Sequence, residues 1–380
     1  MPKSIFSFFS GAGLLDLGFE NQGYNIVSVN EYNEAFLNAY TYARAEHNNE
    51  HIPPVYGYHC CDINDFLVGE GNQILHERIT EQINAGNLVG FIGGPPCPDF
   101  SIGGKNRGRD GENGILAKSY VDLIINCRPD FFVFENVKGL VKTEKHRIYY
   151  NELKQSLVDA GYTISDSVLN ALSFGVPQDR ERVILVGISN ELFDLGEYTN
   201  EDGFLEFPWL ENATFEAPLD VKQMQWKTNQ RFCEDSTRYY PRELPQEYRE
   251  LCVETWFRRN DVLNHPNGND VFKVKKGLTK MKIIAEGDVS RKSFKRLHRW
   301  RYSPTAAYGN NEVHLHPYKV RRLSVAEAMA IQSLPAWFSL PPTMTLSNKF
   351  KVIGNGVPYL MAEAMAMTLG EMLDELQEGI

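Results

Sequence analysis

Short apolar runs recur through the first half of the chain, and each one stops at glycine, proline or a polar residue. The runs cover residues 5–9, 24–29, 88–92, 131–134 and 183–187. Runs of this length, bounded by turn residues, are typical of buried parallel strands. Helical spacing follows at residues 14–19, 120–127 and 149–160. Because strands and helices alternate, the pattern predicts an α/β fold built on a parallel sheet.

A glycine turn follows the first apolar run and opens a helix. Gly11 and Gly13 let the backbone approach a ligand, and a helix N-terminus favours electron-rich groups. Glu31 follows the second run, 20 residues after Gly11, where nucleotide-binding α/β folds place an acid for ribose hydroxyls. Asp62 follows a third candidate strand and suits an adenine amino group. Asp16 stands where the dinucleotide fingerprint has its third glycine, which favours an adenosyl ligand without phosphates.

The run at residues 88–92 leads into a rigid turn that carries Cys97 just beyond the strand. Two prolines fix the backbone φ angles before this thiol. A basic, glycine-rich loop follows at residues 101–111. A positioned nucleophile followed by such a loop suggests a lid that closes over a substrate. From this stretch alone, a turn with an incidental cysteine remains the alternative.

Three more charged side chains flank apolar runs. Glu135 follows the run at residues 131–134, on the carboxyl edge where α/β folds bind ligands. An acid at a strand end also serves as a helix cap or a surface group. Arg180 and Arg182 precede the last run and point to the same side if this stretch is extended. Paired guanidinium groups suit phosphate or carbonyl oxygens, and a salt-bridged surface pair is the alternative.

Residues 189–316 lose this periodicity and are rich in aromatic, proline and charged residues, so we expect a smaller inserted domain there. The stretch from Lys273 to Arg301 holds eleven Lys or Arg and two acids, a local charge of +9. Mixed arginine and aromatic side chains are typical of nucleic-acid contacts, although most charge runs form a solvated face. The net charge of the chain is −10, which argues against counterion-driven nucleic-acid binding by the whole molecule.

Composition excludes several other classes. Six cysteines without CxxC pairing or zinc-type histidine spacing indicate reduced thiols in a cytosolic protein and predict no metal site. The apolar start resembles a signal peptide only weakly, since it has no polar cleavage region. No segment approaches the ~20 apolar residues of a membrane helix.

The helical pattern returns towards the C-terminus. Ser324 and Glu327 have the spacing of a capping box, which predicts the start of a helix. Residues 350–358 lead into an amphipathic segment, so we expect a C-terminal helix.

Taken in order, the motifs resemble those of the cytosine-C5 DNA methyltransferases. The matching segments are Ser10-Gly11-Ala12-Gly13, Asn30-Glu31, Pro95-Pro96-Cys97, Glu135-Asn136-Val137, Gln178-Asp179-Arg180-Glu181-Arg182, Arg322-Leu323-Ser324 to Gln332, and Gly354-Asn355-Gly356-Val357-Pro358. The resemblance covers residues 4–190 and 318–365. The middle stretch is where that family carries its variable target-recognition domain.

The resemblance implies a Rossmann-like S-adenosylmethionine-dependent methyltransferase sheet with helices on both faces, plus a smaller inserted target-recognition domain. The expected parts are a catalytic and cofactor-binding domain (1–189), the target-recognition domain (190–317), a hinge and support segment (318–349), and a C-terminal helix returning to the catalytic domain (350–380). The implied reaction is methyl transfer to C5 of a cytosine flipped out of a specific short double-stranded DNA sequence.

The resemblance also implies roles for individual residues. The Cys97 thiolate adds to C6 of cytosine, protonated Glu135 donates to N3, and Arg182 holds O2. Arg180 and Ser101 contact phosphate or orient the loop. The cofactor pocket matches Phe9, Gly11, Gly13, Glu31, Asp62, Ile63, Pro96, Asn355 and Val357. The expected DNA contacts are Ser101, Lys105, Arg107, Arg109, Gln178, Arg296 and Arg299.

Two positions depart from the family pattern. Pro98 stands where the family usually has Gln or Asn after the catalytic cysteine, which removes a side-chain amide and a backbone donor. Ser7 stands where many members have Asp. Neither position is the nucleophile, so we expect activity to survive.

Other functions compete with this interpretation. The nearest is the same chemistry on RNA, as in the tRNA-methylating branch that shares these motifs, and another is a non-catalytic DNA-binding regulator on the same scaffold. A cysteine hydrolase lacks a histidine in a matching motif, and a nicotinamide oxidoreductase lacks its phosphate-binding glycines. We expect a monomeric, cytoplasmic prokaryotic enzyme that works alongside a restriction endonuclease without a membrane.

Overall fold

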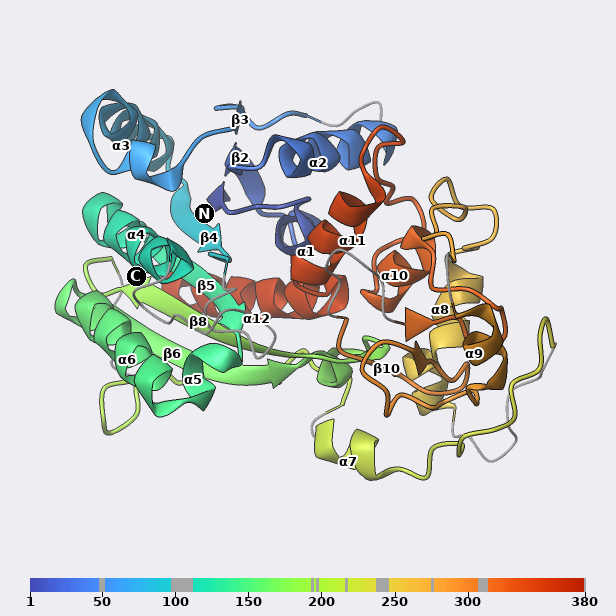
Figure 1. Cartoon of the computed structure of the whole chain (residues 1–380). Coiled ribbons are helices and arrows are strands. Elements are labelled where there is room, and N and C mark those ends of the chain that lie inside the picture. Colours follow the sequence, from blue (N-terminus) through green and yellow to red (C-terminus); the bar gives the residue numbers. More distant parts are fainter. Residues whose placement is uncertain are drawn as a thin grey trace.

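The computed structural model describes residues 1–47, 52–96, 112–192, 195, 198–215, 218–236, 246–274, 277–306 and 314–378. Its centre is a seven-stranded sheet in the order β3-β2-β1-β4-β5-β8-β6 (Figure 1). The strands are β1 (Lys3–Phe8), β2 (Asn25–Asn30), β3 (Tyr58–His59), β4 (Leu88–Gly93), β5 (Phe131–Val137), β6 (Tyr162–Asn170) and β8 (Glu181–Ser189). Each of the five apolar runs coincides with one of these strands, which confirms that part of the prediction.

Helices cover both faces of the sheet (Figure 1). Ile5 and Ile92 share one core with α1 (Leu14–Asn21), α2 (Glu34–His47) and α12 (Tyr359–Glu378). Phe6 and Phe91 share the other with α3 (Gly69–Asn84), α4 (Glu112–Cys127) and α6 (Glu144–Asp159). Successive strand residues point to opposite faces, so a strand covered on both faces is apolar throughout. The predicted α/β class with helices on both faces is confirmed.

The sheet is parallel except at one strand. β1 runs parallel to β2 and β4, and β5 runs parallel to β4, so the carboxyl ends of these strands share one edge. In contrast, β8 lies antiparallel between β5 and β6. The register pairs Val137, at the end of β5, with Arg182, at the start of β8. The antiparallel direction therefore brings Arg182 to the same edge as the carboxyl ends of the parallel strands.

The yellow-to-orange part of the chain lies beside this sheet (Figure 1). It contains α7 (Pro218–Gln223), α8 (Val253–Arg259), α9 (Leu278–Ile283) and the short strands β9 (Lys295–Arg296), β10 (Ser303–Pro304) and β11 (His314–Leu315). β10 pairs with β7 (Gln178–Asp179), just ahead of β8. This pairing joins the inserted segment to the chain just before β8. The exact domain boundaries stay a prediction.

The C-terminal segment returns to the sheet. α10 (Val325–Ile331) begins with the predicted capping box, in which the Ser324 side chain and the Glu327 side chain each accept from the other's backbone amide. α11 (Leu346–Asn355) precedes α12, which packs closely on α1. A Cβ on Gly18 of α1 would lie 2.6 Å from the Ala362 backbone, so this contact needs glycine. None of the described helices is long and apolar enough to cross a membrane.

Candidate active site

The site residues gather where the parallel strands end. Gly11 follows β1, Glu31 follows β2, and Pro96 follows β4. Glu135 lies near the carboxyl end of β5, and Arg182 lies on the neighbouring strand β8. Parallel strands deliver their carboxyl ends to one edge, which is where open α/β sheets bind ligands. Six predicted residues of the Cys97 region lie outside the described residues, namely Cys97, Pro98, Ser101, Lys105, Arg107 and Arg109.

The turn after β1 has an unusual backbone. Phe9, Gly11 and Gly13 all have positive φ angles, of 53°, 59° and 73°. A Cβ on Gly13 would lie 2.3 Å from the Tyr40 ring, so this position requires glycine. A Cβ on Gly11 would meet only Val352, at an ordinary contact distance of 3.8 Å, so this side of Gly11 is open. The turn is therefore packed from below and accessible at Gly11.

Glu31 is fixed by the backbone around it. One carboxylate oxygen accepts from the Gly11 amide at 2.9 Å, and the other accepts from the Asn33 amide at 2.8 Å. Burial raises the pKa of the Glu31 carboxyl, while these hydrogen bonds and the nearby Lys351 oppose the rise. Each oxygen keeps acceptor capacity for a hydroxyl group. The glycine turn and the acid are thus one hydrogen-bonded unit.

Asp62 and Ile63 extend this edge beyond β3. Asp62 caps a short helix by accepting from the backbone and side chain of Asn64, at 2.9 and 2.7 Å. The next residue, Ile63, is buried. Asn30 fixes the approach by donating to the carbonyls of His59 and Cys61, at 3.2 and 3.0 Å. Asp62 and Ile63 thus place a carboxylate next to an apolar side chain.

Glu135 and Arg182 form a buried ion pair with 2.8 Å between Oε1 and Nε. Burial raises the pKa of Glu135, and the charges of Arg182 and Arg180 oppose this rise without cancelling it. A Cβ on Gly94 would lie 2.6 Å from Glu135 Oε2, so the acid packs directly on the turn that leads to Cys97. The Asn136 amide donates to the Pro95 carbonyl at 3.3 Å and ties the same turn to β5.

Arg180 and Gln178 are fully buried. Arg180 donates to the carbonyls of Ala306, Gly354 and Gly356. Gln178 accepts from the Ala306 amide at 2.9 Å and donates towards Gln332 at 3.3 Å. These bonds correct two predictions: neither the catalytic or phosphate contact of Arg180 nor the DNA contact of Gln178 fits a fully buried side chain that is bonded within the protein interior.

Comparison with known proteins decides the family. The sequence model of the family described as C-5 cytosine-specific DNA methylase matches residues 3–371. The chain belongs to the C-5 cytosine-specific DNA methylases. It is therefore a DNA (cytosine-5-)-methyltransferase, and membership implies S-adenosylmethionine as the methyl donor.

Individual relatives agree with the family model. The methylase is 51% identical to the type II methyltransferase M.NmeDI of Neisseria meningitidis serogroup C, over 98% of this chain and 85% of that one. It is 29% identical to the type II methyltransferase M.MthTI of Methanothermobacter thermautotrophicus, over 98% and 99%.

Solved structures of lower identity share its fold. A prophage-encoded E. coli protein assigned as a DNA modification methyltransferase has a TM-score of 0.63 at 20% identity, covering 98% and 99% of the two chains. The S. pombe Dnmt2 methyltransferase has a TM-score of 0.58 at 11% identity, covering 99% of both.

The described pocket residues of the methylase fit an adenosyl donor. Gly11 is open on one side, and the Glu31 oxygens suit ribose hydroxyls. The Asp62 carboxylate suits the amino group of an adenine ring, and the neighbouring Ile63 suits the ring itself. Val357 is buried, whereas Asn355 is exposed at the end of α11. These described residues supply carboxylates and apolar groups.

The basic stretch of the methylase corrects a further prediction. Arg296 and Arg299 are buried, at 0% and 1% exposure, and were expected to contact DNA. Arg299 pairs with the buried Glu286 at 2.8 Å, and Arg296 donates to carbonyls such as that of Ile284. Both hold the inserted segment together. The cations of this stretch that the structure exposes are Lys273, Lys280, Lys282, Arg291 and Lys292.

Sequence reasoning missed a buried network under the glycine turn. Arg44 donates to the Gly13 carbonyl at 3.2 Å and pairs with Glu20 at 2.8 Å. Tyr40 donates to Asp16 at 3.1 Å. These side chains come from α1 and α2 and meet only in the fold, so no local sequence signal marks them. Their bonds fix the turn from below.

This network predicts a pH-dependent stability. Burial raises the pKa of Asp16 from 3.8 to about 6, although Arg44 opposes the rise. The folded protein therefore binds the Asp16 proton more tightly than the unfolded chain does. The stability that this proton contributes is lost as pH rises from about 4 through about 6. Asp16→Asn is expected to gain about 2–3 kcal/mol of unfolding free energy relative to wild type between pH 4.5 and 8.

Urea unfolding of both proteins across that pH range measures the effect. The difference between variant and wild type should grow with pH. A difference that is constant across the range would show that the pKa of Asp16 is the same in the folded and unfolded states.

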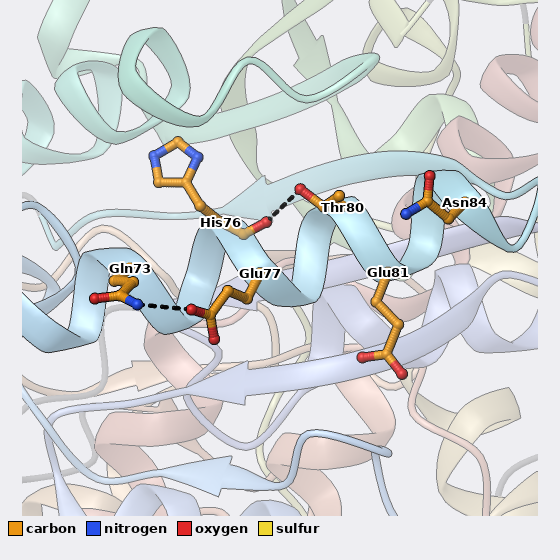
Figure 2. Close-up of a pocket in the computed structure, with 6 residues that line it drawn as sticks. All are labelled: Gln73, His76, Glu77, Thr80, Glu81 and Asn84. Atoms are coloured by element: carbon orange, nitrogen blue, oxygen red, sulfur yellow. Dashed lines mark hydrogen bonds between the residues drawn. The ribbon is translucent and has the colours of Figure 1, made fainter.

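The hollow drawn in Figure 2 lies elsewhere. Its lining side chains all come from α3, at Gln73, His76, Glu77, Thr80, Glu81 and Asn84. Gln73 donates to Glu77 and Thr80 donates to the His76 carbonyl, both at 2.8 Å (Figure 2). α3 ends at Asn84, shortly before β4 begins. This end of the hollow therefore lies near the amino edge of the sheet, opposite the edge that carries Glu31 and Glu135. It is the solvated face of a polar helix.

Proposed function

We propose that this methylase modifies C5 of one cytosine within a specific short sequence of double-stranded DNA, through a covalent bond between Cys97 and C6 of a flipped base. The observation that carries the proposal is the buried Glu135–Arg182 pair, packed on the turn that leads to Cys97. An acid, a guanidinium group and a thiol at one strand edge match the three positions on cytosine that need assistance.

Cys97 supplies the nucleophile. C5 of cytosine is a weak nucleophile, and addition of a thiolate to C6 converts the ring to an enamine with an electron-rich C5. A free thiol has a pKa of about 8.5, so a nearby cation favours the thiolate. Arg182 carries the positive charge at this edge. When bound, S-adenosylmethionine supplies an electrophilic methyl group for C5. A base then removes the C5 proton, and the Cys97–C6 bond breaks, which restores the ring and frees the thiolate.

Glu135 and Arg182 stabilise the charge that develops on the ring. Thiolate addition places negative charge on N3 and O2, where preorganised donors in a dry site are most effective. The raised pKa of Glu135 keeps part of this carboxyl protonated at higher pH than an exposed glutamate, so it can donate to N3. In this proposal Arg182 donates to O2.

A cytosine inside a duplex cannot reach this edge, so the base is flipped out, at a cost of a few kcal/mol. The basic loop at residues 101–111 supplies the cover in this proposal, and the inserted segment reads the sequence. The relatives named above are type II methyltransferases. We accordingly place this enzyme in a modification system beside a restriction endonuclease, as a cytoplasmic monomer.

Transfer of labelled methyl from S-adenosylmethionine to mixed DNA and mixed tRNA tests the proposal. We expect label in DNA alone, and bisulfite sequencing of the product should place it at one short motif. A synthetic duplex already carrying 5-methylcytosine at that motif is the matched control and should accept no label. Label confined to tRNA, or DNA binding without transfer, would contradict the proposal.

A further inference from the structure

Arg180 joins two parts of the chain that are far apart in sequence. It lies between β7 and β8, two residues before Arg182. Its guanidinium group donates to the carbonyls of Gly354 at 2.6 Å and Gly356 at 2.9 Å, and to that of Ala306 at 3.1 Å. The side chain is fully buried. A charged group enclosed in this way needs such bonds, because burial removes its hydration.

The two glycine carbonyls flank Asn355, the last residue of α11. Three side chains secure this helix end. Gln332 donates to the Ile353 carbonyl at 2.8 Å, Gln178 bonds Gln332, and Arg180 bonds the carbonyl on each side of Asn355. Val352, one turn earlier, faces the open side of Gly11. The position of the segment 352–357 relative to the glycine turn therefore depends on this buried cluster.

We propose that Arg180 is a positioning residue for the methyl donor, acting by holding the Gly354–Gly356 backbone so that Asn355 and Val357 complete the pocket. This inference rests on the proposed function, which assigns these two residues to that pocket. Arg180 touches neither the base nor a phosphate. It couples the pocket to Arg182, since both arginines leave the same short stretch of chain.

The geometry requires arginine in particular. A guanidinium group has five donors in a rigid plane and reaches three carbonyls at once, whereas a lysine ammonium is a single point on a flexible stem. Arg180→Lys keeps the positive charge near Glu135 and removes the fork. It therefore separates the geometric role of Arg180 from its electrostatic one.

The matched control is Arg296→Lys. Arg296 is also fully buried and also donates to several main-chain carbonyls, among them those of Ile284 and Met281, which lie inside the inserted segment. Both substitutions should lower thermal stability. Binding of S-adenosylhomocysteine, measured by calorimetry where all proteins are folded, should weaken about tenfold for Arg180→Lys and less than about twofold for Arg296→Lys.

Two further readouts complete the test. Hydrogen exchange of peptides covering residues 350–358 should accelerate in Arg180→Lys alone, without any ligand. The value of kcat at saturating donor should stay within about threefold of wild type, because the reacting atoms are untouched. Unchanged binding, equal weakening in both variants, or a large loss of kcat with normal binding would each overturn the inference. If the wild type failed to bind S-adenosylhomocysteine, the proposed function would fail instead.

Discussion

Cys97→Ser is expected to abolish methyl transfer to DNA, with a loss of roughly 10³-fold or more. A serine hydroxyl is not ionised near neutral pH and has no dedicated base in the proposed site, so it cannot add to C6 of cytosine. Binding of DNA and of the methyl donor should persist, because the substitution changes a single atom. Single-turnover transfer of labelled methyl measures the loss.

A covalent trap distinguishes loss of the nucleophile from misfolding. DNA with 5-fluorocytosine at the target position should form a denaturant-stable adduct with wild type, because fluorine at C5 cannot leave as a proton does. Cys97→Ser should form none. Cys233→Ser, which replaces an exposed thiol, is the matched control and should behave as wild type. An adduct that survives in Cys97→Ser would assign the nucleophile to another residue.

Three other cysteines of the described chain are poor candidates for that role. Burial raises the pKa of Cys61 to about 11 and that of Cys127 to about 12, and it raises the pKa of Cys252 well above its ordinary range. Thiols that remain protonated are weak nucleophiles. These three thiols are therefore unsuited to the role that the motif assigns to Cys97.

The sequence predicted the strands that are buried on both faces. β4 and β5 are continuous apolar runs, because helices cover them on both sides. β6 was missed, since its middle carries the polar residues Ser165, Asp166 and Ser167 at the edge of the sheet. The direction of β8 was equally invisible, because a hydrophobic run is the same read in either direction.

The sequence predicted positions in the site better than roles. Glu31 and Glu135 could be placed because a residue after a parallel strand has a fixed location. Arg180, Arg296 and Arg299 were assigned to ligands because a sequence displays charge and not burial. Each bonds main-chain carbonyls or an internal acid supplied by other segments of the chain. Such partners become neighbours only once the chain has folded.

Glu135→Gln is expected to lower kcat by about 10²–10⁴-fold, the range of a lost general acid. Glutamine keeps the shape, and its carbonyl oxygen can still accept from Arg182 Nε at the present 2.8 Å separation. Its amide can donate a hydrogen bond to N3 but cannot transfer a proton there. The fold and the turn before Cys97 should therefore survive while the ring charge loses its neutralising proton.

The pH profile separates this role from a purely structural one. Burial raises the pKa of Glu135, so the wild-type activity should decline as pH rises through that value and the acid ionises. This decline should be absent from the residual activity of Glu135→Gln. Glu181→Gln is the matched control, since Glu181 is a neighbouring carboxylate paired with Lys138 at 2.7 Å and half exposed. It should keep the rate within about twofold and retain the wild-type profile. A Glu135→Gln enzyme with normal kcat, or one with the wild-type decline, would remove the proton donor from the proposed mechanism and leave Arg182 to stabilise the ring alone.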